Sequence, residues 1–279
     1  MSKKYEFTDE TITVDGHTLH RIRAVRCFSD VKAGEIGGWV EKEDNLSQTG
    51  NAWVCNNAKV YSNATVFDNA VVFDNAQVFD NAFVYGNASV FDNASVYGRA
   101  SVYGLALVGN QAKVYGNVCI YGNASIISKS KVFGNAMVFD NASVLGHAEI
   151  YGYSRIYDIA TVHGDSKIHG VSHICGNANI HGTAEISDSA KCSGDAEICG
   201  DAVVKNKEDY IVFKNFWSSG RYFTWTRSNN MWRVGCFYGT GEELIKKAYK
   251  DSEKSGREYE RVVRYVESIL ADEKKGGEV

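Results

Sequence analysis

A branched apolar residue or a cysteine occupies every sixth position from Val54 to Val204, which makes 26 consecutive hexads. The residue four positions later is small in nearly every hexad, and a short fixed period indicates one unit stacked on copies of itself. The branched residue favours an extended, inward position, and the Gly/Asp-Asn pair after it favours a sharp corner, because Asn tolerates a left-handed backbone. Three hexads predict one triangular coil of 18 residues. With coils about 4.8 Å apart, the stack is a prism about 40 Å long.

The hexads occupy residues 52–204, and both flanks lack them. In residues 1–51, two alternating segments surround Asp15-Gly16, which predicts a hairpin. The segment 34–39 is interpreted as a glycine-rich turn before a bulky apolar residue. We interpret 1–51 as an N-terminal cap, because the first coil of any stack has an open edge that aggregates unless it is covered.

Residues 205–279 predict a small α+β domain. Strands are expected over 210–213, 221–226 and 232–237. Thr240 and Glu243 have the spacing of a capping box and predict a helix start. An apolar stripe predicts a second helix over 258–270.

A representative hexad, Val66-Phe67-Asp68-Asn69-Ala70-Val71, resembles the hexapeptide-repeat family, whose motif is branched-Gly-x-x-small-x. The second position departs from it, because Phe or Tyr is usual here where the family has Gly. The resemblance covers about 150 residues and implies a mainly β fold: a three-sided left-handed parallel β-helix with an N-terminal cap and a C-terminal α+β domain. A right-handed solenoid is the alternative. As a whole the chain resembles prophage-borne proteins labelled as hexapeptide-repeat transferases without an established activity, through segments 21–24, 32–40 and 231–236.

Composition and charge narrow the function classes. The net charge is −4, and residues 52–162 carry only −1, so the repeat does not favour DNA binding. No apolar run follows Met1, which predicts neither secretion signal nor membrane span. Seven dispersed cysteines without a CxxC pair indicate reduced thiols, and we expect a cytoplasmic protein.

The 18-residue coil sorts outward side chains into columns. Aromatic residues directly after the branched residue recur 18 positions apart and predict stacked ladders. A monomer rarely exposes an extended apolar patch, so a face of the prism is also expected to be covered by another subunit or by the tail domain. The interface residues of this homo-oligomer hypothesis are Phe67, Phe83, Tyr85, Tyr103, Tyr121 and Phe139.

Four histidines cluster late in the repeat: His163, His169, His173 and His181. In the hexapeptide acyltransferases a histidine deprotonates the acceptor and acyl-CoA lies between neighbouring prisms of a trimer, so the resemblance implies one of these as the base of an acyltransferase. The alternative is that histidine replaces tyrosine in a surface ladder. A metal site is not expected, because three or four ligands must converge and a prism spreads these residues over three faces.

The tail holds a dense group of arginine and tryptophan residues. Arginine beside tryptophan can hold a phosphate and stack a base, although a small domain also needs its aromatic residues for a core. The candidate binding residues are Trp217, Arg221, Trp225, Arg227, Trp232 and Arg233.

The uninterrupted repeat lacks the extruded loop that the catalytic members of the superfamily use, and it offers no concave site. We therefore expect a scaffold without catalysis and without a cofactor, presenting the tail to a host protein or nucleotide. The prophage resemblance extends this to counter-defence. The alternatives are an acyl-CoA-dependent transferase and a self-assembling structural solenoid.

Overall fold

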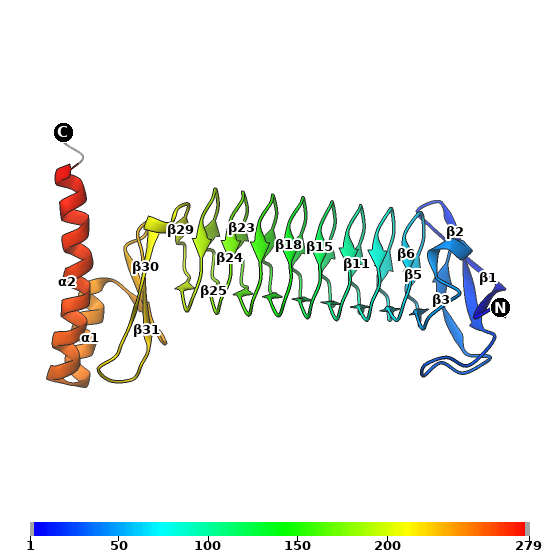
Figure 1. Ribbon diagram of the computed structural model, residues 1–279, viewed down its shortest axis with the longest axis horizontal. Coiled ribbons are helices and arrows are strands. Elements are labelled where there is room, and N and C mark those ends of the chain that lie inside the picture. The colour runs from blue at the N-terminus through cyan, green and yellow to red at the C-terminus, as the bar shows by residue number, and fades with distance from the viewer. Residues whose placement is uncertain (1–2, 277–279) are drawn as a thin grey trace.

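A computed structural model describes residues 3–276 of the chain. A long parallel β-solenoid forms the middle of the molecule, and the two ends of the chain lie at opposite ends of the rod (Figure 1). The expected mainly β solenoid with flanking N-terminal and C-terminal regions is confirmed. In the described part of the chain, no helix is both long enough and apolar enough to cross a membrane.

Each hexad supplies one strand of two residues, the branched residue and the one before it. The first is β4 (Trp53–Val54), each later strand begins six residues further on, and the last is β29 (Val203–Val204). Every strand pairs in parallel with the strand 18 residues away, as Ser89 does with Leu107. This register produces three parallel sheets, so the cross-section is three-sided.

The core runs along the axis of the rod. All of the inward branched residues from Val54 to Val204 are fully buried, and so are almost all of the small residues four positions later. Cys192 fills one of these inward positions, and burial raises the pKa of its thiol. All seven cysteines are free thiols.

The corners correct one detail of the sequence interpretation. The left-handed residue is the second after the branched one, for example Asp68 with φ 57°, and not the Asn that follows it. Asn forms ladders instead: the Asn51 side chain donates to Asn69 Oδ1 at 2.9 Å, and Asn69 donates to Asn87 Oδ1 at 3.2 Å. The corner carboxylates also link coils, since Gly98 N donates to Asp80 Oδ2 at 3.0 Å.

The aromatic columns form the predicted ladders. Phe67 and Tyr85 stack with ring centroids 4.8 Å apart, and Tyr85 and Tyr103 do the same. This ladder continues through Tyr121 to Phe139 and Tyr157. Five of the six proposed interface residues therefore already use their ring faces within the chain, whereas Phe83 stands outside the ladder with 43% of its surface exposed.

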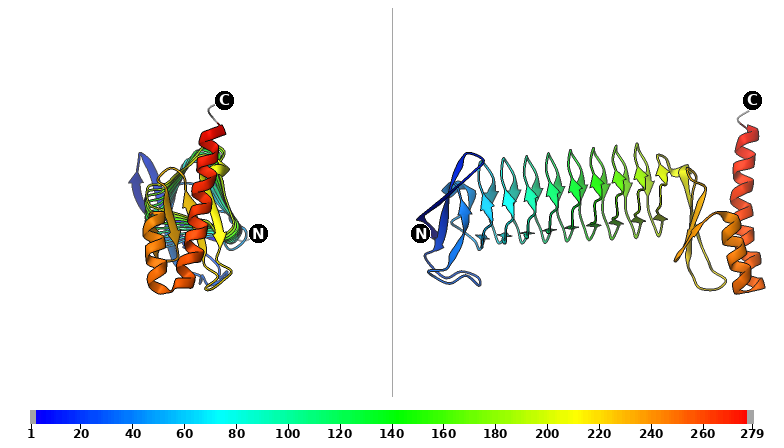
Figure 2. Two further views of the ribbon diagram at one scale, coloured as in Figure 1. Left: turned by 90° about the vertical axis from the view of Figure 1, so that its left-hand side faces the viewer. Right: turned by 180° about the vertical axis from the view of Figure 1, so that it is seen from behind.

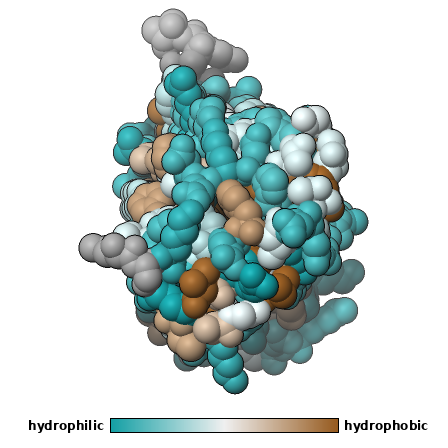
Figure 3. Space-filling model, turned by 90° about the vertical axis from the view of Figure 1, so that its right-hand side faces the viewer, coloured by the Kyte–Doolittle hydropathy of each residue, from teal (hydrophilic) through white to brown (hydrophobic). Residues whose placement is uncertain are grey.

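Strands β1 (Tyr5–Val14) and β2 (His17–Ala24) form the predicted hairpin around Asp15-Gly16. The expected glycine-rich turn is wrong over most of its length, because β3 (Ile36–Val40) is a strand that pairs with β5 (Lys59–Val60). Glycine is needed at Gly37, where a Cβ would approach the Trp53 ring to 2.6 Å. A short 3₁₀ helix (Glu43–Asn45) leads into the first coil. Seen along the axis, this end is mostly hydrophilic (Figure 3).

The C-terminal region is an antiparallel sheet backed by two helices. A 3₁₀ turn (Lys207–Asp209) precedes β30 (Tyr210–Lys214), β31 (Tyr222–Thr226), β32 (Met231–Val234) and β33 (Phe237–Gly239). The strand predicted over 232–237 is thus two strands, separated by a turn with Gly235 at φ 56°. Helix α1 (Gly241–Asp251) has the predicted capping box, and α2 (Glu253–Gly276) begins five residues before its expected start.

The antiparallel sheet lies across the last coil, and the two helices cover its outer side (Figure 2). Phe223, Trp225 and Trp232 form a core with the helices. The other face of β31 is directed at the solenoid, where Thr224 and Thr226 are buried. The C-terminal region therefore also closes the second end of the core.

Candidate functional site

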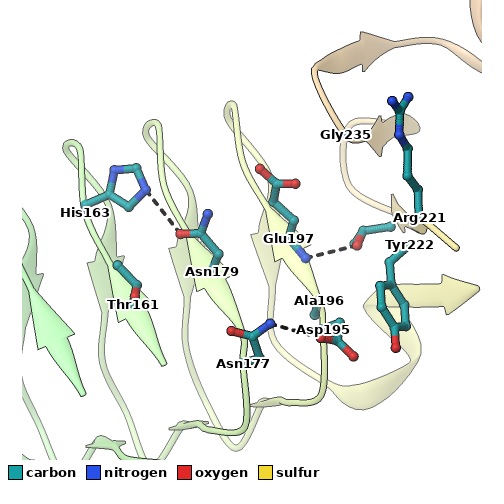
Figure 4. A pocket seen from close by; sticks show the side chains of 11 residues that line it. Thr161, His163, Asn177, Asn179, Asp195, Ala196, Glu197, Arg221, Tyr222 and Gly235 are labelled. Atoms are coloured by element: carbon teal, nitrogen blue, oxygen red, sulfur yellow. Dashed lines mark hydrogen bonds between the residues drawn. The ribbon is translucent and has the colours of Figure 1, made fainter. Parts of the chain in front are cut away.

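A cleft of about 460 Å³ lies at the junction of the solenoid and the C-terminal sheet (Figure 4). The solenoid side is lined by Thr161, His163, Asn177, Asn179, Asp195, Ala196 and Glu197. The other side is lined by Arg221, Tyr222, Thr224 and Gly235. This volume falls within the range of small-molecule sites, about 300–1,000 Å³.

The repeat determines which side chains line the solenoid side of the cleft. Thr161, Asn179 and Glu197 precede branched residues in β22 (Thr161–Val162), β25 (Asn179–Ile180) and β28 (Glu197–Ile198), and they stand in register one coil apart. Their side chains point outward because the branched neighbour points inward. The same face is occupied by Ser125 and Ser143 in earlier coils, so polar, longer side chains appear only next to the tail.

Two asparagines of the cleft each keep one polar group without a partner among residues 3–276. His163 Nε2 donates to Asn179 Oδ1 at 3.1 Å, which leaves Asn179 Nδ2 available as a donor. Asn177 Nδ2 donates to Asp195 Oδ1 at 3.0 Å, which leaves Asn177 Oδ1 available as an acceptor. Figure 4 shows both hydrogen bonds and the two amides on adjacent parts of one coil.

The carboxylates of the cleft are held charged by donors. Burial acts to raise the pKa of Glu197, but hydrogen bonds from His181 and Arg233 outweigh it and hold the pKa below its usual value. Hydrogen bonds from Asn177 and Tyr222 likewise lower the pKa of Asp195. The charge of Glu197 is therefore paired with Arg233, whereas that of Asp195 is stabilised by neutral hydrogen-bond donors and, to a smaller extent, by the nearby Lys214.

Glu197 joins the two regions of the molecule. Its carboxylate lies 2.8 Å from Arg233 and 3.2 Å from His181 Nε2, and its backbone N donates to Thr224 Oγ1 at 3.0 Å. These contacts fix the width of the cleft, because they tie the last coil to β31 and β32.

Arg221 is the cationic residue of the cleft without a counterion. It is exposed and forms no ion pair with any residue in 3–276. Its guanidinium extends past Gly235 and away from Asn177 and Asn179 (Figure 4), and a Cβ at Gly235 would lie 3.6 Å from Arg221 Nε. Arg221 also lines a second cavity, on the helix side of the sheet, together with Asp251 and Tyr259. An arginine without a carboxylate partner is suited to binding an anionic group of a ligand.

The structure divides the six candidate binding residues of the tail. Arg221 lines the cleft and Arg233 holds Glu197 at its edge. Arg227 is paired with Glu273 at 2.8 Å, outside the cleft. The expectation for Trp225 and Trp232 is wrong, because they are only 1% and 2% exposed and belong to the sheet-helix core. Trp217 is half-buried against Phe223 and Tyr259.

The four late histidines do not form one site. His163 and His181 stack at 4.9 Å, with His163 in the cleft. His169 stacks on Tyr151 and bonds Glu185, and His173 lies edge-on to Tyr157. No group of three or more metal-ligating side chains is found within residues 3–276. Burial, followed by the nearby His181, lowers the pKa of His163.

Asn177, Asn179, Asp195 and Glu197 were absent from the candidates drawn from the sequence. A signal for two of them existed, because the outward column of Ser and Thr changes to Asn179 and Glu197 in the last two coils. A comparison with protein-family models and a search of curated proteins find no match to this chain.

Proposed function

We propose that this protein is a non-catalytic binding protein in which the solenoid is a rigid scaffold and the junction cleft holds the ligand. The supporting observation is the position of the cleft: polar side chains and the unpaired Arg221 gather where two rigid parts meet. The rest of the solenoid is an uninterrupted prism with no loop between its coils. A ligand of host origin, small molecule or protein, fits the prophage resemblance, and counter-defence by sequestration is the corresponding biological role.

Native mass spectrometry of the full chain, purified gently from a bacterial lysate, tests this proposal. The expected result is a ligand retained without chemical change by the wild-type protein and lost in Arg221→Glu. The matched control is Arg99→Glu, because Arg99 is an exposed arginine on a solenoid corner, far from the cleft in sequence. Equal retention by wild type and Arg221→Glu would contradict the location of the site.

The acyltransferase is the second candidate, and His163 is the observation that favours it. Its lowered pKa keeps the imidazole neutral near pH 7, as a general base requires, and it lies in the cleft. This candidate predicts a trimer that carries CoA in the same mass spectra and loses acyl transfer in His163→Ala. A protein without CoA whose ligand is retained by His163→Ala would instead support the binding protein.

End-to-end self-assembly is less favoured than either. The hairpin strands cover one end of the core and the C-terminal sheet covers the other, so the apolar interior of the first and last coils is not open to another copy. Filaments in electron micrographs of the pure protein would overturn this view.

A further inference from the structure

Three basic residues form a column on a face of the solenoid other than the one that lines the junction cleft. They are the first residues of β21 (Arg155–Ile156), β24 (His173–Ile174) and β27 (Lys191–Cys192). Arg155 pairs in register with His173, and His173 pairs with Lys191, so the three side chains point outward from adjacent parallel strands about 4.8 Å apart. We name these three residues the basic column.

The basic column has no counterion within residues 3–276. None of its three side chains forms an ion pair or a hydrogen bond there, and Arg155 and Lys191 are exposed. The side chains act on one another instead, since burial and then the charges of Arg155 and Lys191 lower the pKa of the His173 imidazole. Both cations are therefore close enough to affect His173, and neither is neutralised.

A column on the next sheet shows how the repeat compensates such charges. It alternates in sign through Lys131, Glu149, Lys167 and Glu185, and Lys131 Nζ lies 2.8 Å from Glu149 Oε1. Opposite charges on neighbouring strands stabilise a sheet, whereas like charges destabilise it. The basic column lacks this compensation, which favours an external anion as its partner.

The length of the basic column limits the kind of anion. It ends at β27, the last strand of its sheet, and spans two strand spacings, or about 10 Å. In the other direction the same positions are occupied by Met137, Cys119 and Ser101, so a long polyanion would find no further cation there. A short anion with several charged oxygens is therefore the better match.

A chain of phosphates has the required chemistry. Guanidinium, imidazole and ammonium groups all donate hydrogen bonds to phosphate oxygens. One phosphate bridges one pair of neighbouring residues. The outer phosphates of a triphosphate are about one strand spacing apart, so a triphosphate reaches both pairs of the column.

We propose that the basic column binds an oligophosphate chain, with phosphate groups bridging Arg155 to His173 and His173 to Lys191. The site shares no residue with the junction cleft. The proposal therefore goes beyond the binding function of the cleft, and either can fail without the other.

Titration calorimetry on the full chain tests the proposal, with inorganic triphosphate, pyrophosphate and phosphate as probes. Low salt is used because salt screens exposed charges. Triphosphate is expected to bind with a Kd below about 1 mM and about tenfold more tightly than phosphate, because only triphosphate engages all three residues. Absence of triphosphate binding, or equal affinities for triphosphate and phosphate, would overturn the proposal.

ATP carries the same phosphate chain and distinguishes an inorganic from a nucleotide source. Equal affinities for ATP and inorganic triphosphate would support recognition through the phosphates. Binding of ATP without any binding of inorganic triphosphate would refute it.

Substitutions of the two cations locate the site. Arg155→Met and Lys191→Met are each expected to weaken triphosphate binding about tenfold, since each removes a charged donor and keeps an unbranched side chain. The matched control is Lys167→Met, because Lys167 is also exposed and has Glu149 and Glu185 as its neighbours in register. An equal loss of affinity in Lys167→Met would indicate a general attraction by charge and contradict the site.

His173→Glu separates binding from folding. It places a carboxylate between Arg155 and Lys191, as in the alternating column, so the variant is expected to melt at or above the wild-type temperature. Triphosphate binding should nevertheless be lost, because the carboxylate neutralises both cations and repels phosphate. A His173→Glu variant that binds triphosphate with unchanged affinity would refute the role of the basic column.

Discussion

One residue in most hexads must adopt a left-handed backbone. Glycine fills that position in some hexads and Asp in others, for example Gly122 with φ 70° and Asp140 with φ 56°. A side chain raises the energy of this conformation, and Asp offsets part of the penalty by bonding across coils: Asp158 N donates to Asp140 Oδ2 at 3.3 Å. The residue at this corner is therefore either glycine, which adopts the left-handed backbone without strain, or Asp, which adds a hydrogen bond between coils.

Two substitutions at Asp140 separate the backbone strain from the hydrogen bond. Asp140→Ala loses the hydrogen bond and keeps a Cβ at positive φ, whereas Asp140→Gly loses the bond but relieves the backbone. We expect the Ala variant to be less stable than the Gly variant by about 1 kcal/mol in urea unfolding. Equal stabilities would show that the hydrogen bond alone decides the residue at this corner.

Lys4 is a buried cation in the N-terminal cap. Its ammonium donates to the Ala52 carbonyl at 2.8 Å and lies 5.2 Å from the Phe28 ring, and its side chain has no exposed surface. Burial, with a smaller effect from Arg26, lowers its pKa from 10.5 to about 8. Between these two values the folded chain holds Lys4 neutral while the unfolded chain still binds the proton, so stability increases with pH in this window.

Comparison with Lys4→Met isolates the contribution of the Lys4 ammonium to the pH dependence of stability. From pH 7.0 to 9.5 the unfolding free energy of the wild type should increase by about 2 kcal/mol relative to the variant, because each pKa unit is worth about 1.4 kcal/mol. Urea unfolding of both proteins at the two pH values measures the difference, and other titrating groups cancel. Parallel pH dependences would mean that Lys4 is not desolvated.

At the scale of elements, the two ends of the solenoid are closed differently. The first coil is extended by a true strand, since β3 pairs in parallel with β5. The last coil is closed by side chains: Glu197 N donates to Thr224 Oγ1, Val203 N to Ser228 Oγ, and Ser193 N to Tyr210 Oη. Hydroxyl groups thus replace the carbonyl acceptors of a missing next coil and satisfy the edge that would otherwise be open.

Thr224 tests this closure. Thr224→Val preserves the shape of the buried Thr224 side chain and leaves the half-buried Glu197 N–H without an acceptor, so we expect a loss of about 1 kcal/mol in the free energy of unfolding. Thr224→Ser keeps the hydroxyl and serves as the control. Amide hydrogen exchange at Glu197 should accelerate in the Val variant, and unchanged exchange would exclude the bond as a stabilising contact.

The sequence predicted the elements better than their contacts. Each hexad correctly predicted a strand, because the signal lies within the hexad itself. Its inward positions, such as Val66 and Ala70, are fully buried. The start of α2 was missed because Ser252 caps it through its hydroxyl, with Ser255 N at 3.1 Å, before the apolar stripe begins. The cleft could not be predicted, because Asn179 and Arg221 come together only through the docking of the sheet on the last coil.

At the scale of the molecule, the solenoid separates the N-terminal hairpin from the C-terminal sheet. Its coils contact only their neighbours, so each adds a similar increment of stability, and the cleft uses only the last coils from Thr161 onward. Scaffold length and ligand binding are therefore expected to be independent. They would be coupled only if a face in the middle of the rod, such as that of Phe83, contributed to the site.

Removal of one whole coil tests this independence. Deleting residues 103–120 brings Tyr121 onto Tyr85 in the same column and keeps every later hexad in phase. The rod should shorten by about 4.8 Å in small-angle scattering, with a melting temperature within about 5 °C of the wild type and unchanged retention of the ligand. Deleting residues 103–111 is the control, because it brings Asn117 to the inward position and should prevent cooperative folding. A folded 18-residue deletion that loses the ligand would show that the middle of the solenoid takes part in binding.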